Sequence, residues 1–238
     1  MKSLTKYLSE AYASISSPKW VRTSTSDELN DNELDIDGRE HGFEYVDLGL
    51  PSKTMWATCN VGASKPEDEG LLFQFGRVDG YKYGDKNNKF RTIGQNIQDT
   101  GSIYIPQTIS GNVYRKNDVL DLEDDAVYAN MGGKWRMPTN DQLEELLNNT
   151  THEVETINGI KGMMFTSKIN NKRLFVPFAG YCYGNFYQKG AYISIWSSQV
   201  YASDVNNAFR LDCYSDGYVV IDSSYRSYAF LVRGVFKK

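Results

Sequence analysis

Residues that commonly carry catalysis are scarce in this chain of 238 residues. It contains two histidines, His41 and His152, and three cysteines, Cys59, Cys182 and Cys213. A serine or cysteine nucleophile needs a base within hydrogen-bond reach, but His41 lies in a polar segment and His152 follows a predicted helix in a polar stretch. The cysteines match no zinc or redox spacing, so we expect small buried thiols. The sequence therefore predicts no catalytic residue and no thiolate metal site.

Carboxylates are plentiful, with 30 Asp and Glu residues, but their arrangement indicates no particular reaction. Calcium requires about six to eight oxygen ligands close together, and the two most oxygen-rich runs, 121–126 and 204–207, show no recognisable ligand signature. A glycosidase requires two carboxyl groups at a fixed separation, which no sequence feature provides. We therefore expect no metal and no cofactor, and a carbohydrate-active enzyme is kept as an alternative.

Tyrosines are concentrated at the C-terminal end, where nine of the seventeen follow position 180 among Ser, Gly and Asn. Antibody loops favour the same residues, because tyrosine gives a large amphipathic contact area with few rotatable bonds. Half-buried strands explain Tyr218, Tyr225 and Tyr228, but they explain the glycine-broken stretch 183–192 less well. The sequence thus predicts a ligand-binding face. Its predicted residues are Tyr183, Phe186, Tyr187, Tyr192, Gln199, Tyr201, Asp204, Asn206, Asn207, Tyr214, Asp216 and Asp222.

The elements that must position this face are mostly short. From Phe43 onward, brief strand-like runs alternate with Gly, Pro and Asn. The strongest helix is expected at 138–149, where Thr139 and Gln142 have capping-box spacing, and a shorter one at 122–133. Three tryptophans are expected in the core: Trp56, Trp135 and Trp196. The sequence predicts an α+β domain rich in short strands and loops.

Two arginines are expected to be buried as ion pairs. Arg136 and Arg233 have core-like neighbours, and a buried arginine normally requires a partner. We expect Asp124 or Asp125 to supply the carboxylate.

The N-terminal part differs from the rest of the chain. Residues 1–20 are predicted to form an anchoring or oligomerisation helix, and 21–42 a polar linker before the ligand-binding domain at 43–238. The helix carries one narrow apolar stripe, which predicts docking to a partner. The stripe consists of Leu4, Tyr7, Leu8, Ala11 and Ile15.

Charge and hydropathy exclude two classes of partner. The formal charge of −4, the pI near 5.3 and the lack of a Lys/Arg cluster disfavour nucleic acid and anionic membranes. No long uninterrupted apolar run is present, so neither membrane insertion nor a secretory leader is expected.

Several motifs together resemble the Fibrobacter-type major paralogous domain family, which occurs in surface and phage proteins of gut Bacteroidetes. They are EYVDLGLPSKTMWATCNVGA at 44–63, DDAVYANMGGKWRMPTNDQLEELL at 124–147, and RSYAFLVRGV at 226–235. The resemblance covers about residues 43–236 and implies a C-type-lectin-like fold. It also implies relatives whose C-terminal stretch is hypermutated by diversity-generating retroelements to alter ligand binding.

The combined interpretation is a non-catalytic virion protein, a phage head or tail fibre or decoration protein. Its N-terminal segment is expected to dock to capsid or tail proteins and to support a homotrimer, while its C-terminal face attaches to a host-surface glycan or protein. A bacterial cell-surface lectin or adhesin of the same family is the first alternative. A domain that only braces a larger assembly, without a ligand, is another.

Overall fold

The computed structural model describes residues 34–83, 108–109 and 112–238. The compact unit that contains them begins at Leu34. Of the described residues, 45% lie in strands and 9% in two helices, which makes the body mostly β and similar in class to a β-sandwich. The predicted α+β, C-type-lectin-like fold is therefore wrong. Sheet faces supply most of the core, and within the described ranges the two capped segments are the helices. The predicted anchoring helix and the linker up to residue 33 lie outside the described residues.

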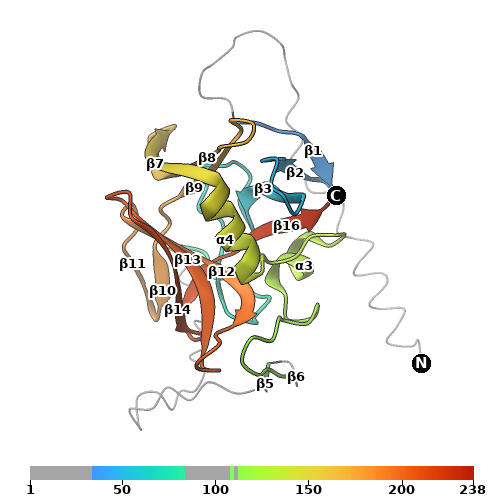
Figure 1. The fold of residues 1–238 in the computed structure, drawn as a ribbon. Coiled ribbons are helices and arrows are strands. Elements are labelled where there is room, and N and C mark those ends of the chain that lie inside the picture. Colours follow the sequence, from blue (N-terminus) through green and yellow to red (C-terminus); the bar gives the residue numbers. More distant parts are fainter. Residues whose placement is uncertain (1–33, 84–107, 110–111) are drawn as a thin grey trace, which may run out of the picture. The chain divides into compact units, whose positions relative to one another are not determined.

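The largest sheet is built almost entirely from the C-terminal third of the chain (Figure 1). All its pairs are antiparallel except β12 with β15, and β4 pairs with β15 outside the main strand order. Consecutive hairpins bring β12, β13 and β14 together. In spatial order the strands are β11 (Asn185–Tyr187), β10 (Tyr181–Tyr183), β15 (Ala229–Leu231), β12 (Tyr192–Val200), β13 (Asn207–Tyr214) and β14 (Val219–Tyr225), with β4 (Leu72–Gln74).

Three smaller sheets complete the body. Four antiparallel strands lie in the order β1 (Gly38–Glu40), β2 (Phe43–Val46), β3 (Thr54–Asn60) and β16 (Arg233–Lys237). Three more form β7 (Thr150–Ile157), β8 (Ile160–Ser167) and β9 (Arg173–Pro177). A two-stranded pair joins β5 (Thr108–Ile109) and β6 (Asn112–Val113).

Both described helices were predicted by their caps. In α4 (Asn140–Asn149), Thr139 and Gln142 form the reciprocal capping box, which satisfies free N–H groups of the first turn. In α3 (Ala126–Met131), the carboxylate of Asp125 accepts hydrogen bonds from two backbone amides, and Gly132 ends the helix with a positive φ of 68°. Neither described helix is long and apolar enough to span a membrane.

Two hydrophobic clusters make up most of the core. The first lies between the three larger sheets and the buried side of α4, with Leu143 and Leu146. The second surrounds Trp135 and Trp196 on the other face of the C-terminal sheet. The three predicted core tryptophans are confirmed as buried. The indoles of Trp135 and Trp196 donate to backbone carbonyls, whereas the N–H of Trp56 has no partner among the described residues.

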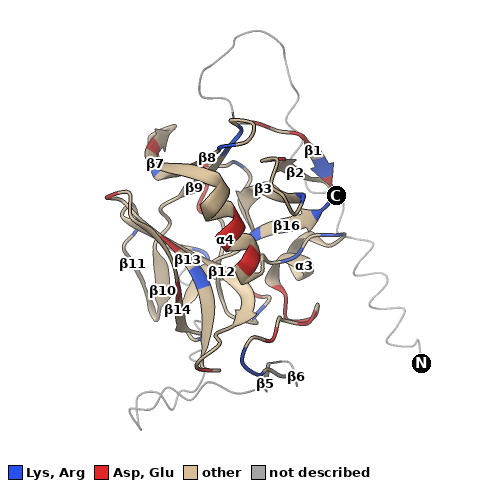
Figure 2. Ribbon diagram, in the orientation of Figure 1, with Lys and Arg blue, Asp and Glu red and all other residues tan. Residues whose placement is uncertain are grey.

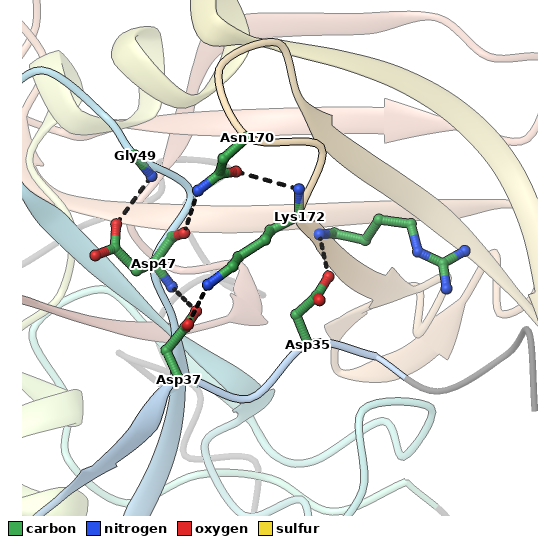
Figure 3. Close-up of polar contacts among 7 residues, drawn as sticks. Asp35, Asp37, Asp47, Gly49, Asn170 and Lys172 are labelled. Atoms are coloured by element: carbon green, nitrogen blue, oxygen red, sulfur yellow. Dashed lines mark hydrogen bonds and ion pairs between the residues drawn. The ribbon is translucent and has the colours of Figure 1, made fainter. Parts of the chain in front are cut away.

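The end of the expected linker is part of the body, because residues 38–40 form β1 and pair with β2. Figure 3 shows how the segment before β1 is fixed. The carboxylate of Asp37 accepts a hydrogen bond of 2.7 Å from the amide of Asp47 and pairs with the ammonium of Lys172. The carboxylate of Asp35 accepts one of 2.9 Å from the amide of Arg173. Residues 34–37, called the strap below, therefore connect the four-stranded and three-stranded sheets.

Asn170, in the turn between β8 and β9, holds Asp47 and Lys172, which both contact Asp37 of the strap (Figure 3). The side-chain amide of Asn170 donates to the carbonyl of Asp47 at 2.8 Å, and its oxygen accepts from the amide of Lys172 at 3.1 Å. Leu34, the first residue of the strap, packs on the small cluster of Ile157, Met164 and Phe175. The strap thus combines charged hydrogen bonds with apolar contact.

Candidate ligand-binding face

Tyrosines from several strands meet on one face of the C-terminal sheet. Strand register places Tyr192 opposite Tyr214, and Tyr181 opposite Tyr187, so each pair projects to the same side. Successive ring centroids lie 5.2, 5.9, 5.0 and 5.9 Å apart. We call these five rings the aromatic row: Tyr187, Tyr181, Tyr192, Tyr214 and Tyr218.

Further aromatic rings contact the row at Tyr181, its second ring. Tyr228 lies 5.8 Å from Tyr181, and Tyr183 stacks on Tyr228 at 4.6 Å with an interplanar angle of 14°. Tyr228 in turn stacks on Phe230 at 5.9 Å, which belongs to the second core cluster. The row is thereby anchored to the core along one side.

Exposure varies along the aromatic row. Its two ends are open, since Tyr187 is 42% and Tyr218 58% exposed. Tyr181 and Tyr214 are half-buried, and Tyr192 in the middle is buried. The face therefore presents aromatic surface to solvent at both ends of the row, while the buried ring of Tyr192 lies between them.

A charged group supports the middle of the row. The guanidinium of Arg210 donates to the hydroxyl of Tyr192 and pairs with the buried carboxylate of Asp212. Tyr192 also donates to Asp212 at 2.6 Å. The second guanidinium nitrogen lies 3.6 Å from a carboxylate oxygen of Asp222, whose side chain is 60% exposed. Arg210 itself is only 12% exposed and lies over the ring of Phe230 at 5.3 Å.

Burial determines the protonation of this group. Burial raises the pKa of Asp212, although the nearby cation of Arg210 opposes the shift. Burial and the carboxylate of Asp212 also raise the pKa of Tyr192. At neutral pH the phenol therefore keeps its proton and donates a hydrogen bond to the carboxylate of Asp212, which fixes the ring of Tyr192 in place.

Turn residues set the two ends of the row. Gly180 has a positive φ of 72°, and a Cβ there would lie 2.0 Å from the carbonyl oxygen of Tyr187, so only glycine fits against the β11 end. At the other end, the carboxylate of Asp216 accepts a hydrogen bond of 3.0 Å from the amide of Tyr218. The turns at Gly180 and Asp216 thus orient the exposed rings of Tyr187 and Tyr218.

The structure brings together five of the twelve predicted ligand-binding residues on this face. They are Tyr183, Tyr187, Tyr192, Tyr214 and Asp222. Asp216 lies beside them in the turn before β14. Phe186 points to the opposite face, because it packs on the first core cluster although it neighbours Tyr187 in sequence.

The other five predicted residues lie around the opposite end of the β12–β13 hairpin. Tyr201 packs edge-on against Phe209 at 5.0 Å, and Gln199 donates to the carbonyl of Asn117. The carboxylate of Asp204 accepts from Asn206 and Asn207, and so forms the turn itself. Eight residues of β13 separate the two ends by about 25 Å. The predicted set therefore forms two regions, of which the first contains several adjoining tyrosine rings and the second contains Tyr201 against Phe209.

Five members of the face were not predicted from the sequence: Tyr181, Arg210, Asp212, Tyr218 and Tyr228. The available signal was alternation, because Arg210, Asp212 and Tyr214 occupy every second position of one strand. Finding them required the pairing of β12 with β13, which projects all three to the side of Tyr192.

No group of three or more His, Cys, Asp or Glu side chains in the part of the chain that the structure describes is arranged to hold a metal. The three cysteines are free, and Cys182 and Cys213 are buried. Burial raises the pKa of the Cys182 thiol to about 11, which keeps it protonated at neutral pH. His152 lies on β7, 6.4 Å from the ring of Phe165, in a different sheet from the aromatic row.

No protein-family model, curated protein or solved structure matches this chain. The resemblance stated from the motifs stays a prediction.

Proposed function

We propose that this is a non-catalytic binding protein of a virion, in which the aromatic face attaches to a glycan or protein on the host surface. The observation that supports the proposal is the continuous row of five tyrosines, open at both ends and fixed at its centre by Arg210 and Asp212. Tyrosine gives large contact area at low conformational cost, with a hydroxyl at the rim for hydrogen bonds.

A shallow face of this kind benefits from repetition. A millimolar Kd corresponds to only about −4.1 kcal/mol, whereas several linked copies raise avidity by roughly 10² to 10⁴. We propose that the N-terminal segment supplies this repetition by docking to capsid or tail proteins and by supporting a homotrimer. Antibody labelling of purified particles tests the location, and particles that carry no label would exclude a virion protein.

The binding role is tested by adsorption of the purified protein to host cells. The variant with Tyr187→Ala and Tyr218→Ala removes both exposed ends of the row and is expected to lower adsorption about tenfold or more, with unchanged thermal unfolding. The matched control is Tyr225→Ala, because Tyr225 is 45% exposed but lies on the opposite face of β14 from Asp222. Equal adsorption of the double variant and the control would contradict the proposal.

A further inference from the structure

We infer that the aromatic row binds an extended, electrically neutral glycan chain that crosses the strands, and that Asp222 and Asp216 exclude acidic glycans. This inference depends on the proposed binding function and specifies its ligand. Three features of the molecule support it: the length of the row, the chemistry along it, and the charge beside it.

The length of the row favours a chain over a single sugar. Its rings come from β11, β10, β12, β13 and the residue before β14. The four steps between successive ring centroids measure 5.0 to 5.9 Å, so the row is about 20 Å long. One pyranose ring covers about one tyrosine ring, so a single sugar leaves most of the row in water. A linear oligosaccharide that runs across the strands can contact the exposed and half-buried rings on both sides of the buried Tyr192.

The chemistry along the row matches a sugar better than an apolar peptide. Rings offer flat surfaces to the C–H face of a pyranose, and their hydroxyls lie at the rim for sugar hydroxyls. Asp222 adds a carboxylate with exposed oxygens near Tyr214, which can accept hydrogen bonds from two neighbouring hydroxyls. Tyr187 and Tyr218, the most exposed rings, are amphipathic rather than aliphatic. A site with convergent polar groups among aromatic surface is typical of small-molecule recognition.

The charge beside the row disfavours anions. Arg210 is mostly buried, and Asp212 and Asp222 already neutralise it. Lys189, near the β11 end, pairs with Glu69. Figure 2 shows that β10, β11 and β12 carry no charged residue, whereas β13 carries both signs. Among the described residues around the row, the exposed charge without an ion-pair partner is the carboxylate of Asp216.

The exposed carboxylates beside the row repel carboxylated or sulfated sugars at close range, because like charges a few ångströms apart repel even in water. It leaves neutral hexoses and N-acetylated amino sugars unaffected. A protein ligand is the competing class, and the experiment below separates it from a glycan.

The test measures binding of the full-length protein by calorimetry and on an array of neutral and acidic oligosaccharides of graded length. Hexamers of glucose and of N-acetylglucosamine are compared with their dimers and with a hexamer of galacturonic acid. We expect binding among the neutral chains only, with hexamers about tenfold or more tighter than dimers, because the longer chain covers more of the row. The change Tyr218→Ala is expected to reduce hexamer binding and to leave dimer binding nearly unchanged.

Substitutions of Asp222 test the predicted exclusion of acidic glycans. Asp222→Lys reverses the exposed charge near Tyr214 and is expected to give at least tenfold tighter binding to the galacturonic acid hexamer than wild type shows. Asp222→Asn removes the repulsion without adding a cation, and its affinity for the acidic hexamer is expected to lie between the two.

Three outcomes would overturn this inference and leave the proposed function standing: preference for acidic chains, equal affinity for dimers and hexamers, or absence of glycan binding while cell adsorption still depends on Tyr187 and Tyr218. Loss of the proposed function has a different signature. In that case adsorption to host cells is independent of both tyrosines, whatever the array shows.

Discussion

Arg233 and Arg210 are both withdrawn from solvent, but they are held by different kinds of partner. Arg233 is fully buried, and its guanidinium donates to the side-chain oxygen of Asn60 at 2.8 Å and to the backbone carbonyls of Thr58 at 2.7 Å and Phe175 at 3.0 Å. These bonds link β16 to β3 and to β9, and therefore join two sheets. Burial lowers the pKa of Arg233 to about 10, so the side chain stays charged at neutral pH.

Arg210 has side-chain partners instead. It contacts Tyr192, Asp212 and the exposed Asp222, and its Nε has no hydrogen-bond partner among the described residues. Backbone carbonyls cannot move without moving strands, whereas an exposed carboxylate can exchange its partner for a ligand. The comparison indicates that Arg233 stabilises the fold, while Arg210 positions a face whose outer contacts are replaceable.

The largest expected effect is that of Arg233→Met. The change leaves several buried acceptors without their donor, and each such group costs about 1–3 kcal/mol, so we expect a loss of about 3 kcal/mol or more in the free energy of unfolding. Denaturant unfolding measures it. The control Arg39→Met removes an exposed pair with Glu44 and is expected to change stability by less than about 0.5 kcal/mol. Equal midpoints for the two variants would contradict a structural role for Arg233.

Arg210→Met is expected to have a smaller effect on stability and a larger one on binding. Without the cation, the pKa of Asp212 rises further and the buried carboxyl takes up a proton, which limits the loss to about 1–2 kcal/mol. Adsorption to host cells is expected to fall, because Tyr192 loses a donor that fixes it.

The double variant Arg210→Met with Asp212→Asn sharpens the comparison. Removing the carboxylate together with its cation is expected to restore part of the stability, as neighbouring partners are not additive. If the two single losses simply add, the pair does not act as one unit.

The sequence predicted the parts of this molecule that are encoded locally. We could predict the capping box at Thr139 and Gln142 and the glycine that ends α3, because helix caps depend on residues only a few positions apart. Burial of the tryptophans followed from their apolar neighbours. The fold class was wrong because short strands give no information on which partners they pair with.

The lack of information on strand pairing also limited the prediction of the ligand-binding face. Phe186 and Tyr187 are adjacent in sequence, yet only strand pairing shows that they lie on opposite sides. Arg233 was expected to pair with a carboxylate, but it uses carbonyls that arrive from two other strands. Arg210 and Asp212 were overlooked because charged residues in a strand are usually solvated, and their burial arises from the rings around them.

The strap gives a third kind of contact, partly exposed and dependent on pH. For Asp37, burial by itself raises the pKa of the carboxyl, but the hydrogen bond from the amide of Asp47 and the pairing with Lys172 outweigh it and lower the pKa below the ordinary 3.8. Its stabilisation is therefore present above pH 3.8 and lost as the pH falls through the lower pKa of the folded state. Asp212 has the opposite sign, since its raised pKa gives a contribution that is present below 3.8 and lost as the pH rises through the folded value.

The smallest expected effect is therefore that of Asp37→Asn. Because the carboxylate is partly exposed and screened by solvent, we expect a loss of about 1 kcal/mol or less at pH 7. As the pH falls below 3.8 and through the lowered pKa of the folded state, the wild-type carboxyl also becomes protonated, so the difference between the two proteins is expected to disappear. Denaturant midpoints measured from pH 7 down through that lowered pKa provide the test. Lys172→Met removes the same ion pair from its other end and is expected to reduce the pH dependence without abolishing it, since the bond to the amide of Asp47 remains. A constant difference between Asp37→Asn and wild type across this range would show that the strap is held by Leu34 and its apolar neighbours, and not by its charges.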